Sequence, residues 1–178
     1  MFYILICFIT IFYASRVDLM YENLTGALML SNYHNYIILH IILCAVFFAY
    51  KTNVLYQLLP ISTKSYTIII KCSAIMMILG AFFPYTLNGQ DIFSQLHVYC
   101  TMIPCLSFLI LLFIYNRLLS LYFPSIYQKV HLFYDCSLQV LGILIVVLTR
   151  VNGYIEILFF LIVCYDLFLI ENHFKKIS

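Results

Sequence analysis

Charged side chains are scarce in this sequence. Only 9% of its 178 residues are Asp, Glu, Lys or Arg, whereas 65% are hydrophobic. A soluble domain carries roughly a quarter charged residues, so this chain cannot cover a surface that faces water. The apolar runs are long and show no strand alternation, which predicts an all-α, multi-pass membrane protein. The net charge of +2 is too small and scattered for a nucleic-acid partner.

Tryptophan is absent, whereas the chain has 16 Tyr and 16 Phe residues. Tyrosine must therefore supply the aromatic side chains at the membrane interfaces. The seven cysteines form no CxxC motif and nearly all fall inside apolar runs, where cysteine usually acts as a small hydrophobic side chain. Disulfides and metal ligation are the alternatives. The many Ile, Lys, Asn, Tyr and Phe residues hint at a bacterium with a low-GC genome.

Dense catalytic motifs are also missing. The sequence contains no HExxH, HxxxH, GxSxG, GxGxxG or Walker motif. It also lacks the DxxDGxxAR signature of membrane phosphotransferases and the EExxxR motif of prenyl-type membrane proteases. These absences weigh against an enzyme without excluding one, and we expect no bound cofactor and no metal.

Six apolar runs predict six transmembrane helices in a single domain that spans residues 1–178. The expected helices cover residues 2–14, 36–50, 66–85, 95–115, 130–149 and 154–170. Pro104 should kink the fourth helix. The first run lacks the basic start and the cleavage site of a signal peptide. It is short for a bilayer that needs about 20 residues, so either the helix continues to about Leu19 or the true start lies upstream.

The lysines and arginines are unevenly shared between the two sides of this topology. Arg16 and Arg150 lie on one side. The other side carries seven basic residues: Lys51, Lys64, Lys71, Arg117, Lys129, Lys175 and Lys176. By the positive-inside rule both termini are expected in the cytoplasm, in the cytoplasmic membrane of a bacterium. The polar hairpin of residues 80–97 then faces outward.

This orientation places a group of polar residues at the outer side. An ionisable side chain within the membrane costs about 2.5–3.5 kcal/mol, so such residues usually face the bundle and find partners. The favoured interpretation is structural, with Arg150 or His97 paired to Glu156. The alternatives are a pocket for a lipid headgroup or small polar ligand, and a catalytic or metal site that uses histidine and carboxylate. The candidate residues are His40, Asp91, His97, Arg150 and Glu156, with Glu22, His34 and Asn152 nearby.

A second polar group is expected at the inner side. His131, Asp135 and Gln139 recur at every fourth position, which places them on one helical face. A contact of Asp135 with Lys71 or Arg117 would neutralise its buried charge. A structural polar stripe is favoured over a proton or ion path, because nothing charged bridges the apolar midplane where transporters place their sites. The inner candidates are Lys71, Arg117, His131, Asp135, Gln139 and Asp166, with Asn116 and Tyr165 beside them.

The outer hairpin carries a resemblance to a known family. Gly80, Phe83 and Pro84 close the third expected helix and His97 opens the fourth, which resembles the G-x-F-P…H pattern. That pattern is typical of an uncharacterised bacterial family of six-helix membrane proteins, distantly similar to DRAM/FRAG/Sfk-like proteins. Gly153 to Glu156 resembles the Gly-x-x-Glu that often begins their last helix. The resemblance covers the third to sixth helices and implies a lipid-associated or regulatory membrane protein.

Together these patterns predict a non-catalytic, lipid-associated or accessory membrane protein with an outward-facing polar pocket. Its expected partners are membrane lipids, and a membrane protein or a second copy of the chain is a further possibility. The competing hypothesis is a small membrane-embedded enzyme or transporter that uses His97, Glu156 and the inner stripe around Asp135.

Overall fold

The computed structural model describes the whole chain except residues 1, 21–23, 30–31, 87–90, 149–151 and 177–178. The described residues form helices and contain no strand. The helices are α1 (Phe2–Ala14), α2 (Leu24–Met29), α3 (His34–Gln57), α4 (Lys64–Phe82), α5 (Ile92–Tyr122), α6 (Pro124–Leu148) and α7 (Gly153–Phe174). The five from α3 to α7 are long and apolar enough to cross a membrane. The all-α prediction is therefore confirmed, and multi-pass insertion is supported by these five helices.

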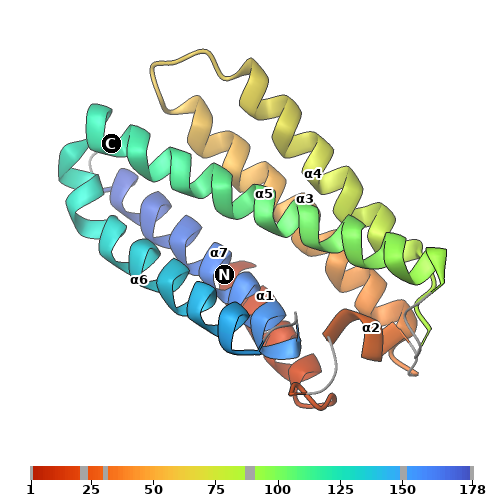
Figure 1. The fold of residues 1–178 in the computed structure, drawn as a ribbon. Coiled ribbons are helices and arrows are strands. Elements are labelled where there is room, and N and C mark those ends of the chain that lie inside the picture. Colours follow the sequence, from red (N-terminus) through yellow and green to blue (C-terminus); the bar gives the residue numbers. More distant parts are fainter. Residues whose placement is uncertain (1, 21–23, 30–31, 87–90, 149–151, 177–178) are drawn as a thin grey trace.

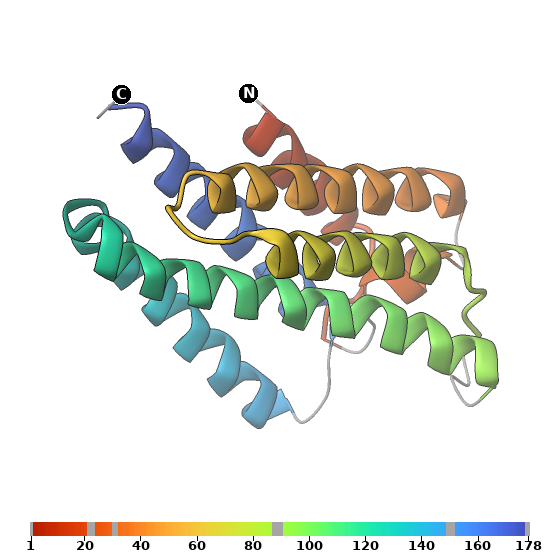
Figure 2. The ribbon, with the colours of Figure 1, turned by 90° about the horizontal axis from the view of Figure 1, so that it is seen from above.

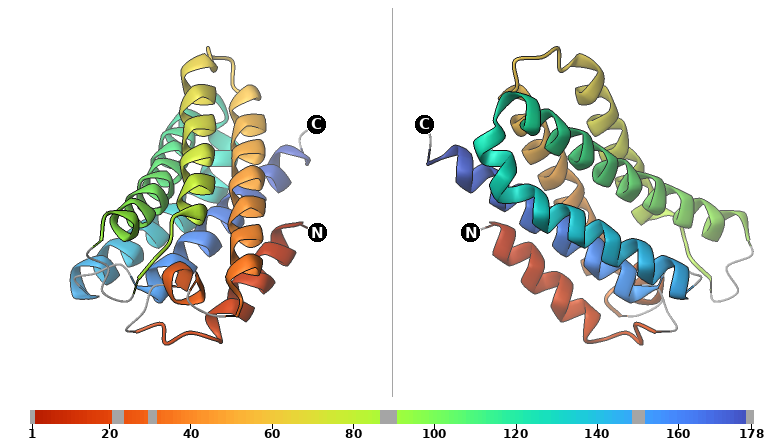
Figure 3. Two further views of the ribbon diagram at one scale, coloured as in Figure 1. Left: turned by 90° about the vertical axis from the view of Figure 1, so that its right-hand side faces the viewer. Right: turned by 60° about the vertical axis from the view of Figure 1, so that its left-hand side comes forward.

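Consecutive long helices run antiparallel in one bundle (Figures 1 and 2). α4 packs between α3 and α5, and α7 packs against α6 and α1. α3 and α5 also contact α7, which joins the two sets of helices. Both ends of the chain lie at one end of the bundle (Figure 3), which we call the inner end. The short α2 lies at the opposite, outer end.

The first helix has the predicted bounds but does not continue to Leu19. α1 has 13 residues, which makes it about 20 Å long at 1.5 Å per residue. At its end Ser15 donates its hydroxyl hydrogen to the carbonyl of Phe12, and the amide of Arg16 bonds to the carbonyl of Tyr13. These tight turns end the helix where polar residues begin. α1 alone is therefore short for a full crossing of a membrane core about 30 Å thick.

The predicted loop of residues 116–129 is wrong. α5 continues through it to Tyr122, and α6 begins at Pro124 after the single residue Phe123. No helix breaker lies between Asn116 and Tyr122, so the backbone stays helical beyond the apolar run. Pro124 suits the first helical position, because its φ is already helical and its missing N–H has no bond to make there. Similarly, α3 continues to Gln57 into the segment expected to be a polar loop.

Aromatic rings pack at the centre, where α3, α5 and α7 meet. The Phe48 ring lies 5.9 Å from the Phe108 ring and 6.1 Å from the Phe159 ring, centroid to centroid. Phe48 and Phe108 have no exposed surface. By contrast, large apolar side chains such as Ile4 and Val146 are 75% exposed on the outside of the bundle. An apolar core inside an apolar exterior is the arrangement that lipid surroundings allow.

Candidate functional site

At the outer end, Thr25 of α2 lies between His97 and Glu156. Its backbone amide donates to Glu156 Oε2 at 3.0 Å, and its hydroxyl lies 3.2 Å from Glu156 Oε1 and 3.4 Å from His97 Nε2. His97 is fully buried, and its Nδ1 donates to the carbonyl of Gly80 at 2.8 Å. His97 and Glu156 are therefore brought together, as the sequence suggested, but through a threonine that the sequence did not indicate.

The acceptors in this arrangement determine where the hydrogens of His97 Nδ1 and Thr25 point. The Gly80 carbonyl can only accept, so His97 Nδ1 carries a hydrogen. Thr25 has one hydroxyl hydrogen to give. It donates this hydrogen to Glu156 Oε1, while its backbone amide donates to Glu156 Oε2, so both carboxyl oxygens of Glu156 have a partner on Thr25. His97 Nε2 lies 3.4 Å from the same hydroxyl, which makes the group a buried link between α2, α5 and α7.

The other outer candidates do not join this group. His40 faces α1, with Nε2 3.1 Å from the hydroxyl of Thr10, and its ring packs on Tyr13 and Phe160. The partners of His40 thus come from α1, α3 and α7, whereas those of His97 come from α2 and α4. In the part of the chain that the structure describes, no three His, Cys, Asp or Glu side chains gather into a metal site. Arg150 and Glu22 lie outside the described residues.

Asp91 and Asn152 cap helices at the outer end. Asp91 Oδ1 accepts from the Ser94 amide at 2.9 Å, and Asp91 Oδ2 accepts from the hydroxyls of Ser94 and Thr86. These hydrogen bonds, with Ser94 first, hold the pKa of Asp91 below its usual range. Asn152 caps α7 by accepting from the Ile155 amide and donates to the carbonyl of Met20. His34 lies exposed at the first position of α3.

The residues predicted to form the inner polar stripe do not all contact one another. Among the described residues, Asp135 makes no ion pair with Lys71 or Arg117. Lys71 and Gln139 are exposed, and Asp135 is half-buried. The reason is that Lys71 lies on α4 and Asp135 on α6, and these two helices do not pack together. Arg117 instead lies 5.0 Å above the Phe113 ring and donates to the hydroxyl of Tyr127.

Two other inner residues have partners outside the predicted stripe. His131 Nδ1 donates to the carbonyl of Tyr127 at 2.8 Å, and its ring stacks on the Tyr127 ring with centroids 4.4 Å apart. Asp166 is fully buried and accepts from Asn116 Nδ2 at 3.2 Å. Asn116 and Asp166 therefore form a buried contact between α5 and α7, whereas His131 belongs to the surface of α6.

Sequence reasoning missed the main charged contact of the inner end. Glu171 Oε2 accepts from Lys51 Nζ at 2.7 Å and from the Tyr3 hydroxyl at 2.6 Å, while Oε1 accepts from Lys175 Nζ at 2.8 Å. We call Lys51, Glu171 and Lys175 the inner charged triad. Glu171 and Lys175 are four residues apart on a helix, a spacing that favours ion pairs and could have signalled part of it. No local pattern points to Lys51 or Tyr3.

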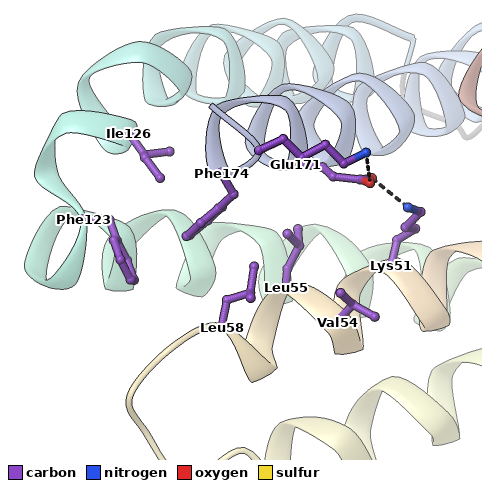
Figure 4. A pocket seen from close by; sticks show the side chains of 9 residues that line it. Lys51, Val54, Leu55, Leu58, Phe123, Ile126, Glu171 and Phe174 are labelled. Atoms are coloured by element: carbon purple, nitrogen blue, oxygen red, sulfur yellow. Dashed lines mark hydrogen bonds and ion pairs between the residues drawn. The ribbon is translucent and has the colours of Figure 1, made fainter. Parts of the chain in front are cut away.

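Two apolar cavities open on either side of this triad, and all three of its residues line both. The first, of about 470 Å³, is lined also by Val54, Leu55, Leu58, Phe123, Ile126 and Phe174 (Figure 4). The second, of about 550 Å³, lies between α1, α3 and α7 and is lined also by Phe2, Tyr3, Leu43, Val46, Phe47, Tyr50, Phe168 and Asn172. The inner end thus presents a charged centre between two apolar grooves.

No family model matches this chain. No curated protein and no solved structure matches it either. The resemblance of the outer hairpin to the six-helix family therefore stays a prediction, and function has to be argued from the geometry.

Proposed function

We propose that this chain is a non-catalytic, lipid-associated protein of a bacterial cytoplasmic membrane, with both termini inside, and that it binds an anionic phospholipid at the inner charged triad. The observation that carries the proposal is the meeting of two apolar grooves at one cluster of charges. A phospholipid has the matching form, with two acyl chains below one charged headgroup. Each groove accommodates part of one chain, and the phosphate lies beside the lysines.

The charge balance of the triad supports an anion. Lys51 and Lys175 carry two positive charges against the single negative charge of Glu171. Each ammonium has three hydrogens and gives one to Glu171, so both keep donors for a phosphate oxygen. The side chain of Lys175 is 71% exposed and that of Lys51 is 21% exposed, so both can be reached from the surface. Glu171 holds the two ammonium groups near one another.

The position of the triad also supports a lipid of the cytoplasmic leaflet. The end of the bundle that holds the triad carries most of the basic residues. Basic residues near an anionic membrane surface each contribute about 1 kcal/mol to binding. We place the site here rather than at the outer end because the described polar partners of His97 and Glu156 are the protein's own groups.

Native mass spectrometry with added phosphatidylglycerol or phosphatidylcholine tests this proposal. The wild-type protein should retain phosphatidylglycerol preferentially. K51Q/K175Q removes both ammonium groups that lie where the two grooves meet, so it should weaken that retention roughly tenfold and clearly more than the control does. The matched control is K64Q/K71Q, which removes two exposed lysines of the same end from outside both grooves. Equal losses in the two double variants would mean general surface charge and would refute a specific site.

A further inference from the structure

The buried contact between Asn116 and Asp166 is incomplete. Asn116 is 3% exposed and Asp166 is fully buried. The two hydrogens of Asn116 Nδ2 go to the carbonyl of Leu112 at 3.1 Å and to Asp166 Oδ2 at 3.2 Å. Because both of these contacts need a donor, the side-chain amide of Asn116 must point its nitrogen, and not its oxygen, towards Leu112 and Asp166. Asn116 Oδ1 and Asp166 Oδ1 are then left buried without a hydrogen-bond partner.

No cation neutralises Asp166 among the described residues. The ion pairs in that part of the chain are those of Glu171 with Lys51 and Lys175. The ionisable groups close enough to Asp166 to influence it electrostatically are acids: Asp135 and Tyr134 on α6, and Tyr115 on α5, whose buried hydroxyl also has no hydrogen-bond partner. Tyr56 of α3 reaches this region through its ring contact with Tyr115.

The remaining neighbours of α7 do not face Asp166. On α1, the hydroxyl of Tyr3 meets Glu171 and the thiol of Cys7 meets Cys164. On α2, Thr25 meets Glu156. An ionised Asp166 would therefore be a charge without a partner in the membrane interior, which is a costly arrangement.

We propose that Asp166 is a proton-binding site. The proton adds to Asp166 Oδ1, which changes the charge of the carboxyl group from −1 to zero. The new O–H group donates to Asn116 Oδ1. A carboxylic acid and a primary amide are complementary in this way, because each donates one hydrogen to the oxygen of the other. One proton thus supplies a partner to both unpartnered oxygen atoms and removes the buried charge.

This inference goes beyond lipid binding and does not rest on it. Asp166 lies five residues before Glu171 on α7, so the proton is expected to enter from the inner end. Between Asp166 and Glu156 the helix is almost wholly apolar, so α7 itself offers the proton no polar path towards the outer cluster.

Infrared spectroscopy of the protein in lipid nanodiscs at neutral pH tests the proposal directly. The difference spectrum between E156Q and E156Q/D166N should contain the carbonyl stretch of a protonated carboxyl group that shifts in D₂O, because E156Q removes the other buried carboxyl group, which could add a band of its own. The wild type and D135N should keep this band. N116A should move the band to higher frequency, because the acid loses its hydrogen-bond acceptor. A wild-type protein without the band at neutral pH has an ionised Asp166 and would overturn the proposal.

Stability against pH provides a second readout. A folded state that holds the proton binds more protons than the unfolded state above about pH 4, the ordinary pKa of aspartate. The unfolding equilibrium constant of the wild type should therefore rise with pH, by up to about tenfold per pH unit. D166N copies the protonated form in shape and hydrogen bonding, so it should fold and show a pH dependence that is smaller than the wild type's by the contribution of one proton. D135N is the matched control and should keep the wild type's pH dependence.

Two outcomes of the stability experiment contradict the inference. If wild type and D166N share one pH profile, Asp166 does not hold a proton that it releases on unfolding. If sodium or potassium stabilises the wild type but not D166N, the occupant of the site is a metal cation rather than a proton. Lipid retention by K51Q/K175Q is measured separately, so failure of either proposal leaves the other standing.

Discussion

At the scale of single residues, Gly80 determines how closely α4 approaches α5. A Cβ atom on Gly80 would lie 3.1 Å from the backbone carbon of Cys100 and 3.0 Å from Cγ2 of Thr101. The carbonyl of Gly80 also accepts the hydrogen bond from His97. A larger residue would therefore push apart two helices and disturb the hydrogen bond that holds His97 between them.

Gly80→Ala should lower the free energy of unfolding by about 1–2 kcal/mol. Overpacking costs typically 1–3 kcal/mol, and the better helix propensity of alanine offsets up to about 1 kcal/mol of it. The control is Gly142→Ala on α6, where the new methyl group meets nothing within 4 Å and stability should stay level or rise. Unfolding of both variants in mixed micelles measures the difference. Equal stabilities would show that α4 and α5 are not closely packed at Gly80.

At the scale of elements, the beginning of α5 depends on Asp91. Its side chain accepts hydrogen bonds from Ser94 and Thr86 outside the apolar part of the helix. An N-cap of this kind satisfies backbone donors that a helix start leaves open, and its negative charge suits the helix dipole. The cap thereby positions the first turns of α5, which carry His97.

Asp91→Asn should remove a pH-dependent part of the stability. The folded pKa of Asp91 lies below its unfolded value, so the folded state favours the ionised form. That contribution is fully present above the unfolded pKa of about 3.9 and is lost as pH falls below it. Wild type should therefore be more stable than the variant at pH 7, and the difference should shrink by pH 3. Asp18→Asn, at an exposed position, serves as the control for general charge, and an unchanged difference at pH 3 would disprove the mechanism.

At the scale of the whole molecule, the up-and-down course of the helices brings most of the basic residues to one end of the bundle. The helices run up and down, so that both termini lie at one end (Figure 3). Lys51 contacts Glu171 close to the end of α7, and Lys64 begins α4, the next helix after α3. Arg16 lies towards the other end, after α1. This asymmetry is the physical basis for the proposed orientation, because basic segments are retained on the cytoplasmic side during insertion.

Labelling with a membrane-impermeant thiol reagent tests the orientation. Single cysteines at Asn88 and at Ser125 are introduced into a variant whose seven native cysteines are replaced. Asn88→Cys should react in intact cells, and Ser125→Cys, in the first turn of α6, should react only after permeabilisation. The replaced background without added cysteines should stay unlabelled. The reverse pattern would place the inner charged triad on the outer face and remove the argument for a cytoplasmic lipid.

The sequence by itself determined the class of the protein and the approximate positions of its helices. Hydropathy and charge are properties of neighbouring residues, so they located α1 to its bounds and the five long helices to within several residues. They did not predict that α5 continues after Asn116. Hydropathy indicates where the apolar part of a helix ends, whereas the helical backbone can continue beyond that point. They also identified His97 and Glu156 as members of one cluster.

Only the tertiary structure decided which polar groups meet. Thr25 joins His97 to Glu156, Tyr3 and Lys51 join Glu171, and Asn116 joins Asp166. The partners in each case come from helices far apart in the sequence, such as α2 and α7 for Thr25 and Glu156. Such contacts depend on how packed helices are rotated and spaced. The sizes of the residues at the helix contacts determine this, as the missing side chain of Gly80 does between α4 and α5. A local pattern of hydrophobic and polar residues does not contain that information.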